Sequence, residues 1–226
     1  MLGKYMFSLF KKTVKPTNEL LCGKLFNGEI DNILGNALID IGFDKIKENK
    51  WVKDLGAGSR QIVTIAHWKG ATSSPSWGYS LDYVPHFDNL RKHIYWHRTN
   101  KSALIDVFPL FFDFQKYSFE RFTSHKNHIK ALKVALPEII RDIELFYSRG
   151  SGLDELISIL ERSKAHDGRG LGFWNYLQLP LAYAFVLNKC GQYESARLLL
   201  LKWIDMYDIK PELIDKLWKR FQLASA

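Results

Sequence analysis

The chain has few of the residues that stabilise a fold from outside its core. Its 226 residues include only two cysteines, Cys22 and Cys190, which lie far apart and match no metal-ligand or redox spacing. A disulfide scaffold is excluded, and two reduced thiols predict a cytoplasmic protein. The chain also lacks an apolar run near the roughly 20 residues of a membrane span. Residues 1–10 are apolar, but lysines follow them without a small-residue cleavage site, which predicts no signal peptide.

What the chain does have is enough apolar surface for a packed core. Apolar residues make up 46% of it and aromatic residues 14%, which excludes intrinsic disorder. The length corresponds to one large or two small domains. The net charge of +8 comes mainly from residues 1–100, which hold 14 of the 32 basic side chains and 9 of the 24 acidic ones. Such a positive field attracts anionic partners, and it also keeps a protein soluble.

The first half of the chain predicts a helix followed by strands. Apolar residues recur every three or four positions over residues 17–43, which predicts a helix that ends at Gly42, with Gly28 as a candidate interruption. Residues 50–53 and 61–68 are β-branched and aromatic, and a glycine-rich turn separates them. They predict a β-hairpin.

The clearest strand is predicted at residues 76–84. Large side chains such as Trp77 and Tyr79 alternate there with small or polar ones, which is the two-residue period of a strand with one buried face. Residues 94–97 and 103–112 are further strand candidates. Four or five strands joined by short loops favour an antiparallel meander packed against the first helix.

After about residue 118 the apolar period becomes helical and stays so. We predict a helix over residues 119–135 and a second one from Pro137, because proline is tolerated at the first position of a helix but not inside one. Four more helices are predicted at residues 153–163, 173–189, 193–207 and 211–223. The fold class is therefore α+β, with an α+β domain over residues 1–117 and an all-helical bundle over residues 118–226.

One part of the chain combines basic and aromatic side chains without a single acid. It runs from residue 91 to residue 101, and the helix expected after it adds lysines along one face. We call the predicted partner-binding residues of these two segments the basic–aromatic strip: Arg91, Lys92, Tyr95, Trp96, Arg98, Lys101, Lys126 and Lys130. Arg121 and Lys133 extend it. Such a surface can neutralise phosphates and stack on bases, and the alternative is a solvated cationic face with the two aromatic rings in the core.

Signals for catalysis are weaker. A metal-dependent hydrolase site could be built around Asp82, His86 and His93. Asp82 and Asp106 could supply the two carboxylates that a nuclease needs to hold a magnesium ion. His125 and His128 lie on one helical face without a nearby carboxylate. The chain has no Gly-x-Ser-x-Gly nucleophile motif. We therefore predict no catalytic residue, no metal site and no cofactor, and keep a metal-dependent hydrolase as an alternative.

The order of elements in residues 18–115 resembles an uncharacterised family of domains of unknown function. The resemblance lies in the helix end at residues 40–43, the strand residue Trp51, the stretch 61–63 and the strand at residues 77–83. Similar proteins occur in bacterial gene neighbourhoods of toxin-immunity and phage-defence systems. The resemblance implies a small cytosolic binding protein without catalytic residues.

Together these observations predict a non-enzymatic binding protein. We expect it to be a bacterial immunity or phage-defence component that recognises another protein, either a toxin or a subunit of a defence complex, and not a membrane. A nucleic-acid-binding module that uses the basic–aromatic strip is the first alternative, and the metal-dependent hydrolase or nuclease is the second.

Overall fold

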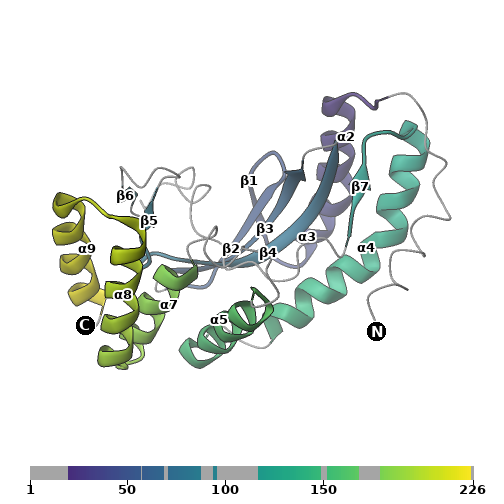
Figure 1. Cartoon of the computed structure of the whole chain (residues 1–226). Coiled ribbons are helices and arrows are strands. Elements are labelled where there is room, and N and C mark those ends of the chain that lie inside the picture. The colour runs from purple at the N-terminus through teal and green to yellow at the C-terminus, as the bar shows by residue number, and fades with distance from the viewer. Residues whose placement is uncertain are drawn as a thin grey trace. The chain divides into compact units, whose positions relative to one another are not determined.

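A computed structural model describes residues 20–56, 58–68, 71–87, 94–95, 117–148, 152–167 and 179–224 (Figure 1). Of these, the residues within 1–53, 62–77 and 113–146 form one compact unit, and those within 54–61, 78–112 and 147–226 form another. We call them the sheet unit and the helical unit. The domain boundary expected after residue 117 stays a prediction, because compact units describe packing and not which segments fold independently.

A five-stranded antiparallel sheet contains most of the described strands. The strand order is β1-β2-β3-β4-β7, so four consecutive strands form a meander, and β7 pairs with β4 after a long connection. The first strand of this meander was not predicted, and residues 94–95, expected to form a later strand of it, pair with residues 86–87 outside this sheet. The strands are β1 (Asp44–Lys47), β2 (Lys50–Asp54), β3 (Ser59–Trp68), β4 (Thr72–Leu81) and β7 (Phe119–Glu120). Two short strands, β5 (His86–Phe87) and β6 (Ile94–Tyr95), form a separate antiparallel pair. The predicted α+β class and the hairpin are confirmed; the strand candidate at residues 103–112 lies outside the described residues.

The N-terminal helix is confirmed, but its irregularity is not at Gly28. Helix α2 (Gly23–Ile30) passes through a π-helical segment (Asp31–Gly35) into α3 (Asn36–Asp40), with helical backbone angles at both junctions. The wide turn brings Gly35 against Trp51 of β2, where an added Cβ would lie 3.0 Å from the indole ring. The π segment thus lies at a close contact between the helix and the sheet.

One carboxylate ties this π segment to the β1–β2 turn. Asp31 accepts a hydrogen bond from the ammonium group of Lys45 at 3.0 Å and another from the backbone N–H of Asn49 at 3.0 Å. Asn49 has a positive φ of 59°, a conformation that asparagine tolerates in turns. The helix side chain Asp31 binds the backbone amide of this turn residue. The helix and the first hairpin are therefore joined by polar contacts as well as by the core.

Strand β4 is buried on both faces, and the prediction of one exposed polar face is wrong. Ser76 and Ser80, placed on the polar face, are 1% and 0% exposed. Part of the reason is that small side chains let neighbouring groups approach the backbone. In the helical unit the Tyr147 hydroxyl reaches Gly78, donating to its carbonyl at 2.8 Å and accepting from its N–H at 3.0 Å. A side chain at this glycine would occupy space beside that contact.

Helix α4 (His125–Ser148) is one continuous helix of 24 residues, so the predicted break before Pro137 is wrong. An interior proline removes the hydrogen bond to the carbonyl four residues earlier, which here belongs to Lys133. Both residues are exposed, so water can take the place of the missing N–H donor. Residues 119 and 120, expected to begin this helix, form β7 instead, because they pair with Thr72 and Ser73 of β4.

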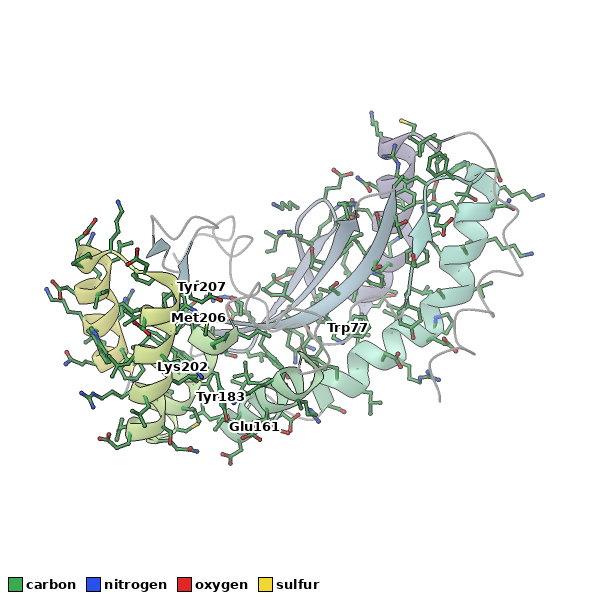
Figure 2. The ribbon with its side chains drawn as sticks, viewed as in Figure 1. Trp77, Glu161, Tyr183, Lys202, Met206 and Tyr207 are labelled. Atoms are coloured by element: carbon green, nitrogen blue, oxygen red, sulfur yellow. The ribbon has the colours of Figure 1, made fainter. Side chains whose placement is uncertain are left out.

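The helical unit is built mainly from α5 (Leu153–Asp167), α7 (Leu179–Lys189), α8 (Tyr193–Tyr207) and α9 (Pro211–Ala224). Helices α7 and α8 form a helical hairpin, in which buried Ala184 and Ala196 permit close approach. Gly191, with φ of 78°, makes the turn. In Figure 2 Tyr183 of α7 lies near Glu161 of α5, and its hydroxyl donates to that carboxylate at 3.0 Å. No helix in the described ranges is both long and apolar enough to cross a bilayer.

Candidate functional site

Most of the basic–aromatic strip lies outside the residues that the structure describes. Five of its residues lie outside the described part of the chain: Arg91, Lys92, Trp96, Arg98 and Lys101. Tyr95 belongs to β6, where its backbone pairs with His86. Lys126 and Lys130 are exposed on α4 together with Lys133, as the spacing predicts. The role of the strip in partner binding stays a prediction.

Arg121, which we placed beside the strip, has a structural role instead. Its guanidinium donates to the backbone carbonyl of Leu21 through Nε at 3.1 Å and through Nη2 at 3.0 Å. The Leu21 N–H in turn donates to the Arg121 carbonyl at 2.8 Å. Arg121 therefore holds the segment before the N-terminal helix against the segment after β7 and has a structural role.

Asp82, a residue of the hydrolase alternative, is paired with an arginine. The Asp82 carboxylate accepts two hydrogen bonds from the Arg60 guanidinium, and this contact raises the pKa of Arg60. Gly58 has φ of 73° and passes so close that an added Cβ would lie 2.9 Å from the Asp82 side chain. Among the residues with described positions, no group of three His, Cys, Asp or Glu could hold a metal ion. His93 and Asp106 lie outside the described residues, as does the His86 side chain.

The two histidines of α4 hold the N-terminal helix and share no ligand. His125 is exposed and its Nε2 lies 2.7 Å from Glu29. His128 is 1% exposed, stacks on the ring of Phe26 with centroids 4.3 Å apart, and donates from Nε2 to the Phe26 carbonyl at 3.1 Å. Burial lowers the pKa of His128, although the nearby Glu29 and the carbonyl act in the opposite direction.

This lowered pKa predicts that stability falls on mild acidification. Above the ordinary histidine pKa near 6.5, His128 is neutral in both states and its contribution to stability is complete. As the pH falls through that value toward the lowered pKa, the unfolded chain binds a proton that the folded chain does not. The loss is limited to about 1.4 kcal/mol per pH unit. Melting temperatures from pH 8 to pH 5 should therefore converge for the wild type and His128→Phe. A constant gap would contradict this role.

The two cysteines are free and differ in character. Cys22 is exposed before α2, and hydrogen bonds from the backbone N–H groups of Lys24 and Leu25 lower its pKa. Burial raises the pKa of Cys190, which lies at the end of α7. Neither thiol has a neighbouring cysteine or metal ligand cluster among the described residues, so neither is assigned a role in the site.

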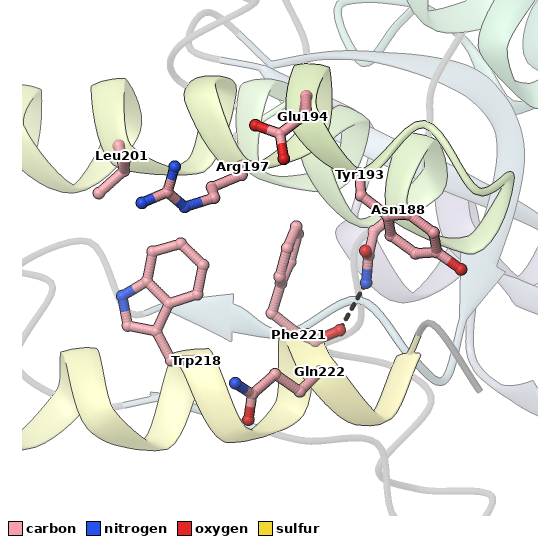
Figure 3. Close-up of a pocket in the computed structure, with 8 residues that line it drawn as sticks. All are labelled: Asn188, Tyr193, Glu194, Arg197, Leu201, Trp218, Phe221 and Gln222. Atoms are coloured by element: carbon pink, nitrogen blue, oxygen red, sulfur yellow. Dashed lines mark hydrogen bonds between the residues drawn. The ribbon is translucent and has the colours of Figure 1, made fainter.

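The helical unit carries a pocket of about 510 Å³ between α8 and α9 (Figure 3). We call it the α8–α9 groove; its walls mix aromatic, aliphatic and charged side chains: Asn188, Tyr193, Glu194, Arg197, Leu201, Trp218, Phe221 and Gln222. The ring of Phe221 is held edge-on by Phe185 and Trp218, with centroids 5.4 and 5.5 Å away. The buried Asn188 amide donates to the Phe221 carbonyl. The aromatic side of the groove is therefore fixed before anything binds.

Large side chains of α8, at the groove or on the same helix, are exposed among the described residues. Tyr193 and Leu201, which line the groove, are 52% and 40% exposed, and Leu198, which is not one of its lining residues, is 63% exposed. Only Ala196, Leu200 and Trp203 of this helix are buried. No motif or charge pattern in the sequence predicted this site. The signal for it is the run of four leucines at residues 198–201, because consecutive residues of a helix cannot all face one core.

Comparisons with models of protein families, with curated proteins and with solved structures found no match to this chain. The resemblance to an uncharacterised family therefore stays a prediction. The case for function rests on the α8–α9 groove and on the lysines of α4.

Proposed function

We propose that this chain is a non-enzymatic binding protein that recognises another protein through the α8–α9 groove. The observation that carries this proposal is the exposure of Tyr193 and Leu201, which line the groove beside a preformed aromatic wall, together with the exposure of Leu198 on the same helix. Contiguous exposed apolar surface rimmed by polar groups is typical of interaction sites. Tryptophan, tyrosine and arginine, which all line this groove, are also the residues that contribute most often to binding energy at protein interfaces.

The rigidity of the groove supports the same function. The ring of Phe221 contacts the rings of Phe185 and Trp218, and its carbonyl accepts from Asn188, so little conformational freedom is lost there when a partner binds. The immunity or phage-defence role, with a toxin or a defence-complex subunit as the partner in the cytoplasm, is the finer form of this proposal. It rests on the resemblance in the first half of the chain.

A nucleic-acid-binding module is the second candidate function. Lys126, Lys130 and Lys133 lie at i, i+4 and i+7 on exposed positions of α4, and none of them makes an ion pair with a described residue. Lysines on one helix face can neutralise phosphates, and such binding weakens steeply with salt. This second function is favoured if the wild type retains an oligonucleotide at low salt and Lys126→Glu/Lys130→Glu does not.

Comparative affinity capture tests the leading function. Tagged wild type, Leu198→Glu/Leu201→Glu and the control Leu223→Glu are incubated with nuclease-treated extract of the source cells, and bound proteins are quantified by mass spectrometry. Leu223 is 66% exposed on α9 but does not line the groove. We expect a protein that wild type and control retain equally and that the double variant retains at least about tenfold less, because buried carboxylates oppose apolar contact. Equal retention by all three baits contradicts the proposal.

A further inference from the structure

The charge in the middle of the α8–α9 groove has no partner within the described residues. Arg197 lines the groove, and in Figure 3 its guanidinium lies across from the indole of Trp218. The structure gives this guanidinium no ion pair or hydrogen bond with a described residue, and Glu194, one turn earlier, is not bridged to it. A partner that covers the groove removes water from the guanidinium, which is unfavourable unless the partner brings an acceptor.

A carboxylate is the acceptor that fits best. The guanidinium is planar and presents donors in a fork that matches the two oxygens of a carboxylate. Glu194 lies at the same wall as Tyr193, toward the start of α8, and it disfavours a second acid at that end. The complementary acid of the partner is therefore expected beside Arg197 and Leu201, not beside Glu194.

The α8 side of the groove is long enough for about two turns of a bound helix. Its apolar positions on α8 run from Tyr193 to Leu201, which are eight residues apart and so span about 12 Å along the helix axis. An amphipathic helix presents apolar side chains at i, i+3, i+4 and i+7, and these cover the same length. The lining residues belong to α7, α8 and α9, and no residue of a described strand is among them, so this surface offers no strand edge for an added strand.

We infer that the α8–α9 groove binds an amphipathic acidic helix of a partner protein. One bulky apolar side chain of that helix packs against Trp218 and Phe221, and a carboxylate one turn away pairs with Arg197. This inference rests on the proposed function, since it names the chemistry of the protein that the groove recognises.

A charge-swap experiment with designed peptides tests the inference. The probe is a fluorescein-labelled, alanine-based helical peptide of about 18 residues, long enough to form a helix in isolation, with a tryptophan between two leucines on one face and glutamates beside them. Its twin carries lysines in place of the glutamates. Dissociation constants are measured by fluorescence anisotropy for wild type, Arg197→Glu and the control Lys202→Glu, which changes an exposed lysine of α8 that does not line the groove.

We expect wild type and Lys202→Glu to bind the acidic peptide roughly tenfold more tightly than its basic twin, and Arg197→Glu to reverse that preference. Leu201→Glu should weaken binding of both peptides. Unchanged melting temperatures would show that these exposed substitutions preserve the fold.

Two results overturn the inference. In one, wild type binds neither peptide; in the other, it binds both equally and Arg197→Glu changes neither affinity. Both leave the proposed function to be decided separately by the capture experiment with Leu198→Glu/Leu201→Glu, which does not depend on the charge of the partner. If all three baits retain proteins equally and the wild type binds neither peptide, both the proposed function and this inference are wrong.

Discussion

Replacing Trp51 with alanine is expected to lower the free energy of unfolding by about 3–5 kcal/mol, the usual cost of deleting a buried aromatic side chain. Trp51 is 0% exposed and lies between the sheet and the N-terminal helix, with its indole against Gly35. For a chain of this size the loss corresponds to a melting temperature lower by about 6–20 °C. Thermal unfolding followed by circular dichroism measures it. A decrease below about 2 °C would mean that this contact does not hold the helix to the sheet.

A second substitution at the same contact provides the control. An added methyl group at Gly35 would lie 3.0 Å from the indole, so Gly35→Ala should cost about 1–3 kcal/mol through overpacking. In the background of Trp51→Leu the ring is gone, and the same substitution should cost little. The two changes are therefore expected to couple strongly in a double-mutant cycle. Simple additivity would place the origin of the Gly35→Ala effect elsewhere.

Phe221→Ala is expected to destabilise the helical unit by a similar amount, about 3–5 kcal/mol. The ring is 6% exposed and contacts two aromatic neighbours, Phe185 and Trp218, so its removal leaves a cavity that rigid helices fill poorly. The same change removes part of the wall of the α8–α9 groove. Urea unfolding followed by circular dichroism gives the stability.

The exposed neighbour Leu223 supplies a matched control for Phe221. It lies on the same helix with 66% of its surface exposed, and Leu223→Ala should change stability by no more than about 0.5 kcal/mol. If the two variants unfold at the same urea concentration, α9 is not packed on α7 through Phe221, and the groove described here loses its fixed wall.

The elements predicted correctly are those whose signals are local. Helix α8 has the predicted bounds, residues 193–207, because Gly191 marks the turn before it and apolar residues repeat along it. Strand β7 was missed because its two residues are extended only through pairing with Thr72 and Ser73, far away in the sequence. The continuity of α4 through Pro137 was missed for a related reason. Whether a carbonyl released by proline is solvated depends on tertiary exposure and not on the sequence nearby.

The candidate site shows a sharper limit of sequence reasoning. The run of leucines at residues 198–201 indicates that part of the apolar surface of α8 does not face the core, which by itself predicts an interface on this helix. The groove itself depends on how far Trp218 and Phe221 of α9 lie from Arg197, and that distance is set by the packing of both helices on α7. Charged strips, by contrast, are easy to see in a sequence and say little about which side chains stay free, as Arg121 demonstrates.

The π-helical segment Asp31–Gly35 affects which side chains of its two flanking helices face the core. A π turn takes up one residue more than an α-helical turn while the helices on either side keep their orientation. Phe26 and Leu38, both 0% exposed, therefore face the core as they would in a regular helix that is one residue shorter. The segment has the form of a one-residue insertion absorbed without rotating either flank. A relative that lacks that residue would keep the same buried face, and would give up the wide turn that brings Asp31 to Lys45 and Gly35 to Trp51.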